Sequence, residues 1–384
     1  MKNTKSLFVL AFASLLFSCG GEKKISYELS WLSPTGSPTL AFYSEAENSN
    51  WVSTSTPAAL IPAAFASASY DAIVFDGITG LNLIEKQQRA YRLASWINEG
   101  SFYLVSAKYD KDGAKNLENR PTIDAFVASG TASVLFRDVA ANTFQWGEYS
   151  NGSSPDDKIV YETGVDVVQK NLLSNPEAFD FYVVAEPALS LLKQKFASQN
   201  KTLHVISDLQ TDFATNHNGV KVPAAAIFVR ERTYLEHPSE TVDWLNDIQS
   251  NIQSVRLGDP QVLQILSSYE EKGISLAERF GFPSSNLVKQ LMEDGSNKLH
   301  YSNCGVDSKS LLAMANDFQS TLGLPVFNET SVLNWRRTLE EEKPKKRIRS
   351  HCLYSYWRSF DYRCVVPNFL FFKKEWKYGF PLSA

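Results

Sequence analysis

The feature that most constrains the fold is the stretch at residues 70–84, which reads YDAIVFDGITGLNLI. Its apolar run at 72–75 predicts a strand buried on both faces, Asp76-Gly77 is a turn signal, and apolar residues then recur at helical spacing. Strand, glycine turn and helix form half of a βαβ unit. In open α/β sheets, ligands bind beside such turns, at the carboxyl ends of strands. This turn is therefore a candidate ligand contact, although most such turns in an α/β protein touch no ligand.

The pattern of strand followed by helix recurs in two blocks. The first block is predicted to hold strands at 25–32, 51–53, 72–75, 90–97 and 102–107, with helices at 40–43 and 58–68. A polar stretch at 108–121 is predicted to cross to a second block, with strands at 123–128, 158–161, 179–184 and 202–206. The apolar strand 222–229 is predicted to return to the first block, and residues 240–322 have the pattern of packing helices.

This order predicts an α/β fold of two lobes joined by two crossings, with a hinge and an interlobe cleft. Residues 25–110 with 225–325 are expected to form lobe 1, and residues 111–224 are expected to form lobe 2. Lobes of this kind close on a ligand by hinge motion. The carboxyl ends of both sheets line the cleft, which is where small polar ligands bind.

Composition and charge argue against several classes of protein. The chain has 384 residues, of which 43% are hydrophobic and 21% charged, as is typical of a globular protein with room for two domains. A formal charge of -4 argues against a nucleic-acid partner. The four cysteines form no CxxC pair and the five histidines are scattered, so no metal site is expected. No cofactor and no catalytic residue is predicted, because no HExxH, GxSxG or Cys-His arrangement occurs.

The amino terminus has the pattern of a targeting signal. Lys2 and Lys5 precede an apolar run at 7–17 that is too short to span a bilayer. The run ends in Leu-Phe-Ser-Cys-Gly at 16–20, which resembles a bacterial lipoprotein cleavage box. The resemblance implies a signal peptide at 1–18, lipidation of Cys19 and a tether at 19–24; an ordinary secretory signal is the alternative. The mature protein is then expected at the cell membrane, lipid-anchored on its extracytoplasmic face, because acyl chains anchor by burying methylene groups.

Residues 335–384 differ from the rest of the chain in composition. A basic run at 343–349 precedes an aromatic stretch that holds Cys352 and Cys364, and neither shows a helical or strand period. We expect a disordered segment or a frame-shifted extension here. A basic and aromatic surface that lies on an anionic membrane is the alternative.

Several short motifs, taken in order, resemble a known family. They are Trp-Leu-Ser-Pro-Thr-Gly-Ser-Pro at 31–38, Tyr-Asp-Ala-Ile-Val at 70–74, Ser-Gly-Thr-Ala-Ser at 129–133, Val-Ala-Glu-Pro-Ala at 184–188 and Lys-Val-Pro-Ala at 221–224. With the lipoprotein box, they resemble a type II periplasmic binding protein, of the branch that includes nitrate, sulfonate, taurine and thiamine-precursor receptors of ABC importers. No single motif is diagnostic, and the resemblance rests on their order over residues 25–325. It implies a monomer that captures one small-molecule ligand and delivers it to an ABC permease and its ATPase.

The resemblance places candidate ligand-binding residues at the strand ends that face the cleft. Backbone amides and hydroxyls at helix starts attract an anion or a polar oxygen, and an aromatic ring can stack on a planar ligand. The candidates are Trp31, Gly36, Ser37, Thr39, Asp76, Gly77, Thr79, Ser129, Gly130, Thr131, Ser133 and Glu186.

Each candidate also has a structural alternative. Ser37 can cap its own helix, Trp31 can belong to the core, and Glu186 can meet the hinge or favour the start of its own helix. If Asp76 and Glu186 both face the cleft, a dianion such as sulfate or phosphate is repelled and an amine, amide or heteroaromatic ligand is favoured. The asparagine and histidine that follow the strand-end tryptophan in pyrimidine-precursor receptors are absent here, so their ligand is not implied.

We therefore predict the membrane-anchored, extracytoplasmic solute-binding component of an ABC importer, and not an enzyme. Two alternatives stay open. A cofactor-biosynthesis enzyme on the same fold would need a positioned nucleophile, an acid–base pair or a metal. A surface lipoprotein that has lost transport would lack a neighbouring permease and ATPase.

Overall fold

The computed structural model describes residues 27–55, 57–87, 90–153, 156, 158–293, 298–303 and 307–333. The predicted signal peptide, Cys19 and the tether lie outside the described residues. The predicted tail at 335–384 lies outside them as well.

The first sheet has five strands and forms the centre of lobe 1. Four strands run parallel to one another, while β10 runs antiparallel between β3 and β4. In spatial order the strands are β2 (Trp51–Thr54), β1 (Trp31–Pro34), β3 (Ala72–Asp76), β10 (Ala225–Arg230) and β4 (Tyr91–Asn98). The return of residues 222–229 to the first block is thus confirmed for β10.

The second sheet also has five strands and forms the centre of lobe 2. Here β5 is the antiparallel strand, between β8 and β9. In spatial order the strands are β7 (Ile159–Glu162), β6 (Ile123–Phe126), β8 (Phe181–Ala185), β5 (Phe102–Ser106) and β9 (His204–Asp208). Each sheet therefore contains one antiparallel strand that the chain delivers directly from the other lobe.

The first crossing lies earlier than the sequence pattern predicts. The strand at 102–107 was expected in lobe 1, but β5 pairs with β8 and β9 of lobe 2. The crossing is therefore Glu99–Ser101, and the polar stretch at 108–121 lies within lobe 2, where it holds the short helix α4 (Lys111–Lys115). The apolar period of 102–106 fits either sheet, so the pattern alone does not decide between them.

The first strand and helix also differ from expectation. The strand expected at 25–32 is β1, which begins only at Trp31, because the Ser30 amide donates to the Asp71 carboxylate (2.9 Å) instead of to a neighbouring strand. The helix expected at 40–43 is a 3-10 helix, η1 (Ser37–Phe42), with Gly36 and not Ser37 at its N-cap. The predicted strand and helix at 70–84 are confirmed as β3 and α3 (Gly77–Gln87).

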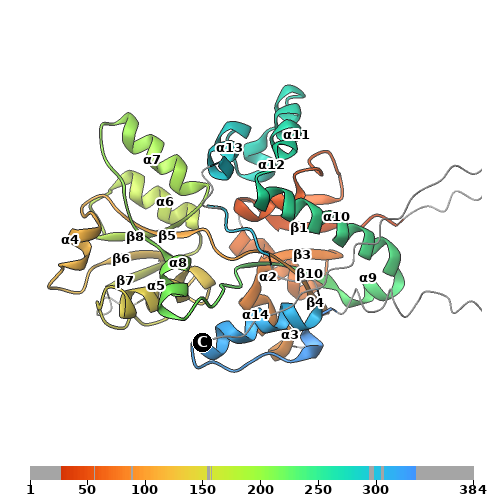
Figure 1. Cartoon of the computed structure of the whole chain (residues 1–384), viewed down its shortest axis with the longest axis horizontal. Coiled ribbons are helices and arrows are strands. Elements are labelled where there is room, and N and C mark those ends of the chain that lie inside the picture. Colours follow the sequence, from red (N-terminus) through yellow and green to blue (C-terminus); the bar gives the residue numbers. More distant parts are fainter. Residues whose placement is uncertain are drawn as a thin grey trace, which may run out of the picture. The chain divides into compact units, whose positions relative to one another are not determined.

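Helices cover both faces of each sheet (Figure 1). On lobe 1, one face carries α2 (Pro57–Ser67), α3 and α14 (Ser308–Thr321). The other face carries η1, α9 (Glu231–Glu236), α10 (Pro238–Leu257), α11 (Pro260–Glu271), α12 (Leu276–Phe280) and α13 (Ser285–Glu293). On lobe 2, α5 (Thr131–Asn142) and α8 (Leu209–Asn216) cover one face, and α6 (Val165–Ser174) and α7 (Ala188–Ser198) the other.

One apolar core continues from lobe 1 into lobe 2. It holds Leu32 and Phe228 of the first sheet together with Leu104 of the second. Between the lobes, Phe318 of α14 packs on Phe213 of α8 with ring centroids 5.2 Å apart. The two lobes are therefore joined by buried apolar packing on the side of α8 and α14, in addition to the two crossings.

Candidate functional site

The carboxyl end of β3 meets the start of α5 across the two lobes. Asp76, the last residue of β3, accepts hydrogen bonds through Oδ2 from the amide of Thr131 (3.1 Å) and from its hydroxyl (2.6 Å). Its Oδ1 accepts from the amide of Thr79 in the first turn of α3 (2.9 Å). We call the bonds between Asp76 and Thr131 the cleft contact. Two predicted ligand-binding residues, one from each lobe, thus bind each other.

Gly77 fixes the position where β3 gives way to α3. A Cβ at this position would lie 2.0 Å from Cζ3 of Trp96 and 3.1 Å from the carbonyl oxygen of Pro223, so only glycine fits. The amide of Gly77 donates to the carbonyl of Ala224 (2.7 Å). Gly77 was predicted to bind ligand, but it is buried against β4 and the return crossing, and its role is close packing.

The start of α5 depends on lobe 1 for its cap. Gly130 occupies the N-cap position and has no side chain with which to accept a hydrogen bond. Thr131 is 2% exposed, and its amide is satisfied by Asp76. Ser133 is fully buried and donates its hydroxyl to the carbonyl of Phe126 (2.6 Å). Ser133 therefore holds α5 against β6 and does not face a ligand, which corrects its predicted role.

The loops after β1 and β8 also approach each other. A Cβ on Gly36, whose φ is +117°, would lie 3.9 Å from Cδ of Pro187. Next to it, Glu186 accepts hydrogen bonds from the amide (3.1 Å) and hydroxyl (3.0 Å) of Ser190 in α7. Burial raises the pKa of the Glu186 carboxyl, and the bonds from Ser190 offset this only in part. Glu186 thus serves the start of its own helix, which is one of the alternatives for this residue.

Thr79 and Ser129 flank the cleft contact with free hydroxyls. Thr79 is half-buried and Ser129 is exposed, and neither hydroxyl has a partner among the residues that the structure describes. Together with Asp76 and the buried Thr131, they place polar side chains of both lobes around the cleft contact. These four are the predicted residues best placed to meet a ligand when the lobes separate.

Two other predicted residues belong to the interior of lobe 1. Trp31 is 1% exposed and packs among Phe42, Trp51 and Trp244, so it cannot stack on a ligand in the cleft. Alternation along β1 points its ring at the face of the sheet that η1 and α10 cover, and not at the carboxyl edge of the sheet. Thr39 is fully buried, and the backbone carbonyl oxygen of Phe280 lies 2.7 Å from its hydroxyl, as an acceptor.

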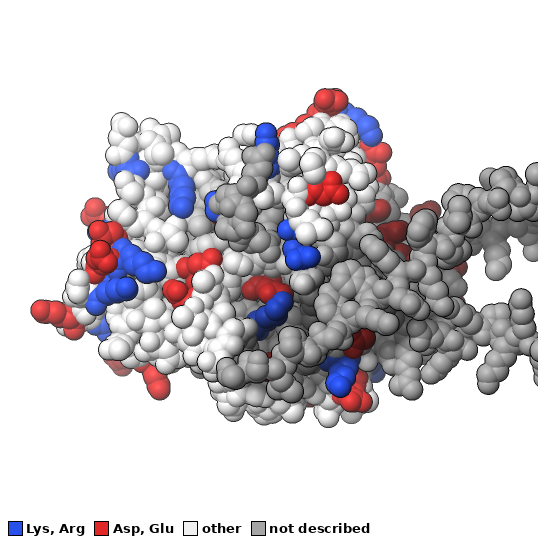
Figure 2. Space-filling model, in the orientation of Figure 1, with Lys and Arg blue, Asp and Glu red and all other residues white. Residues whose placement is uncertain are grey.

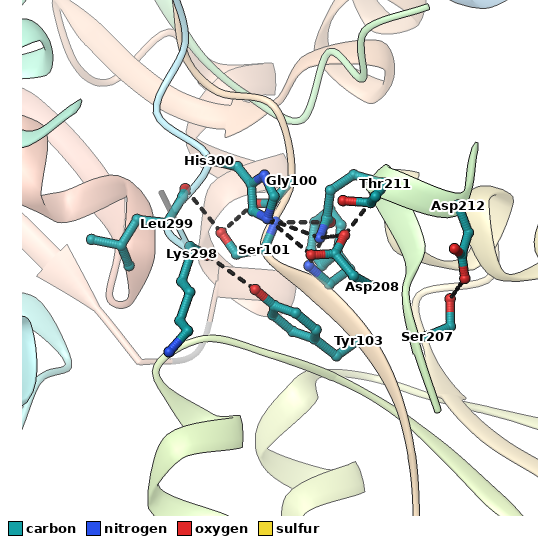
Figure 3. Close-up of polar contacts among 12 residues, drawn as sticks. Gly100, Ser101, Tyr103, Ser207, Asp208, Thr211, Asp212, Lys298, Leu299 and His300 are labelled. Atoms are coloured by element: carbon teal, nitrogen blue, oxygen red, sulfur yellow. Dashed lines mark hydrogen bonds and ion pairs between the residues drawn. The ribbon is translucent and has the colours of Figure 1, made fainter. Parts of the chain in front are cut away.

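A second set of polar contacts lies where the chain crosses between lobes, and Figure 3 shows Ser101, Asp208 and His300 of this set. We call it the hinge cluster. It consists of the side chains of Ser37, Asn98, Ser101, Asp208, Gln210 and His300.

Ser37 and Ser101 form the lobe 1 side of the hinge cluster. The Ser37 hydroxyl accepts from the Asn98 amide group (3.2 Å), and the Ser101 hydroxyl lies 3.3 Å from it. The Ser101 hydroxyl is also 3.1 Å from the carbonyl oxygen of Leu299. Ser37 was predicted to meet a ligand, but it is 4% exposed and its hydroxyl is used by the crossing.

Gln210 ties the crossing to lobe 2. Its Oε1 accepts from the amides of Ser101 (3.0 Å) and Phe102 (2.8 Å), which lie at the start of β5. Gly100 permits this approach, because its φ is +146° and a Cβ there would lie 2.4 Å from the same oxygen. Sequence reasoning missed Gln210, because a glutamine that accepts from distant backbone amides has no motif. It also missed the helix α8, on which Gln210 lies.

The short segment 298–303 lies across both lobes. On lobe 1, the amide of Ser302 donates to the carbonyl of Ile97 in β4 (2.8 Å). On lobe 2, His300 Nε2 lies 3.3 Å from Asp208 Oδ2, and the Tyr103 hydroxyl donates to the carbonyl of Lys298 (3.2 Å). Burial raises the pKa of Asp208, but the bonds from His300 and from the Thr211 amide outweigh it and hold that pKa below its usual value.

A cavity of about 520 Å³ opens beside the hinge cluster. Its lining includes Gln210, Thr211 and His300, and the ion pair between Lys221 and Glu99 (2.8 Å). The residues that line it include none of the twelve predicted ligand-binding residues. The cavity is therefore separate from the cleft contact.

The surface charge fits the small net charge of the chain. On the face seen in Figure 2, acidic and basic side chains of the described residues are interspersed and form no broad basic surface. Among the described residues, no group of three or more His, Cys, Asp or Glu side chains is placed to hold a metal ion. None of the described helices combines the length and the apolar character that crossing a membrane requires.

Comparisons with known proteins identify the fold. The chain matches no protein-family model and, at the level of sequence, no curated protein. An ABC transporter structure from Parabacteroides distasonis is 16% identical with a TM-score of 0.53, and the match covers 79% of this chain and 98% of that one. The alkanesulfonate-binding protein SsuA from Xanthomonas axonopodis pv. citri, bound to MOPS, is 13% identical with a TM-score of 0.51, covering 79% and 97%.

A third similar structure is the periplasmic aliphatic sulphonate binding protein SsuA from Escherichia coli. It is 10% identical with a TM-score of 0.51, and the match covers 80% of this chain and 98% of that chain. The chain has the two-lobed α/β fold of type II periplasmic binding proteins, which confirms the predicted fold class and the resemblance at the level of the fold.

Proposed function

We propose that this chain is the extracytoplasmic solute-binding component of an ABC importer. In this role it captures a small polar ligand between its lobes and delivers it to a permease that an ATPase drives. The observation that carries the proposal is the cleft contact, because it brings a strand end of lobe 1 and a helix start of lobe 2 together at one place. The fold supports it, since similar structures are named as binding proteins or transporters.

The proposed ligand site consists of Asp76, Thr79, Ser129 and Thr131. These residues offer a carboxylate, hydroxyls and the Thr131 amide from both lobes, and a ligand held by both lobes favours the closed state. No step of this function requires a nucleophile or an acid–base pair, so the proposal assigns the chain no enzymatic activity.

A thermal-shift screen tests ligand binding. Sulfonates, amino acids, pyrimidines and polyamines are added in excess, and a ligand at a hundred times its Kd should stabilise the protein by about 2.7 kcal/mol. A double variant, Thr79→Val with Ser129→Ala, should weaken the binding of any hit without lowering the melting temperature of the free protein. Ser250→Ala is the matched control, since this hydroxyl bonds only within α10.

Two outcomes would contradict the proposal. If no solute in the panel raises the melting temperature, the chain does not bind these classes of ligand. If a hit is converted to a product, the same-fold enzyme becomes the better description.

The proposal includes a lipid anchor on Cys19, with residues 1–18 removed as a signal peptide. Metabolic labelling with a fatty-acid analogue tests it, and the label should appear in the membrane fraction of the producing cells. Cys19→Ala should abolish both the label and the membrane association. If the wild type carries no label and is secreted as Cys19→Ala is, the amino terminus is an ordinary secretory signal instead.

A further inference from the structure

The carboxylate of Asp76 lies between the starts of two helices that belong to different lobes. One oxygen accepts from Thr79 in the first turn of α3, and the other accepts from the amide and hydroxyl of Thr131 at the start of α5. A helix start presents unpaired N–H groups and a partial positive charge, so it is a ready site for an anion. Here that anion is part of the chain.

In the part of the chain that the structure describes, no cation pairs with this carboxylate. Among the described residues Asp76 forms no ion pair, so only amides and one hydroxyl balance its charge. An acidic ligand group that approached the start of α5 would need the donors that Asp76 already uses. It would also lie close to a carboxylate of like charge, with no basic side chain from this contact to offset the repulsion.

We propose that Asp76 is a built-in anion that occupies the place of an acidic ligand group, so that the cleft rejects sulfonates and sulfate and accepts neutral or cationic solutes. This inference rests on the proposed function, because it assigns the class of ligand for the same site. The same bond has a second consequence. Asp76 caps α5 only when the lobes are together, so it favours closure in the absence of ligand.

One protein of the same fold has a sulfonate bound. The structure from Xanthomonas axonopodis pv. citri holds MOPS, a sulfonate. In the present chain the start of α5 is occupied by Asp76, and removal of that one charge is the change expected to open the site to sulfonates.

The test is calorimetric titration of the purified protein with methanesulfonate and with sulfate. Asp76→Asn keeps the shape and an accepting oxygen but removes the charge, and it should bind methanesulfonate at least about tenfold more tightly than the wild type does. Asp76→Ser, which keeps a helix-capping hydroxyl, should show the same gain. Adding Thr131→Val to Asp76→Asn should remove the gain, because the site loses its hydroxyl donor.

Asp307→Asn is the matched control, since Asp307 caps α14 through the Ser310 amide (3.0 Å) and takes no part in the cleft contact. It should bind methanesulfonate no better than the wild type. The inference is overturned if the wild type binds methanesulfonate as tightly as Asp76→Asn does. It is also overturned if both folded Asp76 variants gain no affinity.

The proposed function fails in a different way. A wild type that binds a polyamine or an amino acid amide, with no gain of sulfonate binding in the Asp76 variants, supports the binding function and refutes the role of Asp76. A wild type that binds no solute, with variants that gain sulfonate binding, supports the role of Asp76 and refutes a function in transport of the screened solutes.

Discussion

Two of the regions that hold the lobes together differ in chemistry. The cleft contact consists of two hydrogen bonds from Thr131 to one half-buried carboxylate. In the hinge cluster, by contrast, Ser101 is 1% exposed and Gln210 5% exposed, and the apolar core runs past them from one lobe to the other. The first region is small and polar, and the second is buried and tied to the backbone.

This difference indicates where the molecule opens. A hydrogen bond to a charged group contributes about 1.5–3 kcal/mol net, and less where solvent screens a half-buried carboxylate. When Asp76 separates from Thr131, water can replace the lost partner of each group. Breaking the hinge cluster would leave the amides of Ser101 and Phe102 buried without acceptors, which is far less favourable. We therefore expect the cleft to open while the hinge cluster stays intact and defines the axis of motion.

The largest effect is expected at Gly100. Gly100→Ala places a Cβ 2.4 Å from Gln210 Oε1 and imposes strain at a φ of +146°. We expect the free energy of unfolding to fall by about 3 kcal/mol or more, as measured by urea denaturation.

Gly147→Ala separates strain from collision. Gly147 has a φ of +87°, and no described atom lies within 4 Å of its Cβ position, so the loss should be only about 1 kcal/mol. If Gly100→Ala and Gly147→Ala lower the free energy of unfolding equally, the close approach of Gln210 to Gly100 contributes nothing to the loss.

A somewhat smaller loss is expected for Gln210→Leu. This change keeps most of the packing volume but removes the oxygen that accepts from the amides of Ser101 and Phe102. Two buried donors without an acceptor should lower the free energy of unfolding by about 2–3 kcal/mol. Gln194→Leu, on the exposed face of α7, is the control and should change it little. If Gln210→Leu and Gln194→Leu lowered the free energy of unfolding equally, the bonds from Gln210 to the crossing would contribute nothing to stability.

The two regions also differ in how far the sequence could predict them. At 70–84 the strand period, the Asp-Gly turn and the helical period agree, so β3, α3 and the position of Asp76 follow from local pattern. Thr131 follows from the resemblance at 129–133. That Asp76 and Thr131 bind each other could not be predicted, because it depends on how far the lobes close and on which atoms then meet.

Little of the hinge cluster could be predicted from the sequence. Gln210 bonds to the amide of a residue 109 positions away, and His300 reaches Asp208 from a segment without regular structure. Asn98-Glu-Gly100 has the composition of a tight turn, and only the pairing of β5 with β8 and β9 shows that it is a crossing. Trp31 illustrates the opposite error, since a strand-end aromatic was considered for the ligand and belongs to the core.

A pH-dependent effect is expected at Asp208, on the lobe 2 side of the hinge cluster. Its pKa lies below the ordinary 3.8 because bonds from His300 and Thr211 outweigh burial. A carboxyl whose pKa is lower in the folded state stabilises the fold above the unfolded pKa, and this contribution disappears as the pH falls through the folded pKa. Asp208→Asn should therefore lower the free energy of unfolding by about 1 kcal/mol at neutral pH.

Urea denaturation over a range of pH checks this expectation. The difference between wild type and Asp208→Asn should shrink as the pH falls below 3.8. A difference that stays constant down to strongly acidic pH would show that the substitution acts through packing and not through the charge.

The smallest effect on stability, and the most direct test of the comparison, is expected at Thr131. Thr131→Val removes the 2.6 Å bond from its hydroxyl to Asp76, and it should change the free energy of unfolding by less than about 1 kcal/mol. Native-state hydrogen exchange should nevertheless report it, because the amides at the start of α5 exchange when the cleft opens. We expect these amides to exchange several-fold faster in Thr131→Val, while the amides of Ser101 and Phe102 keep their wild-type rates.

Thr215→Val is the control, because the Thr215 hydroxyl bonds within α8 to the carbonyl of Thr211 (2.8 Å). It should leave the exchange rates of both sets of amides unchanged. Equal acceleration at α5 and at the hinge would mean that the lobes separate as one cooperative event, and the distinction between an opening cleft and a fixed hinge would then be wrong.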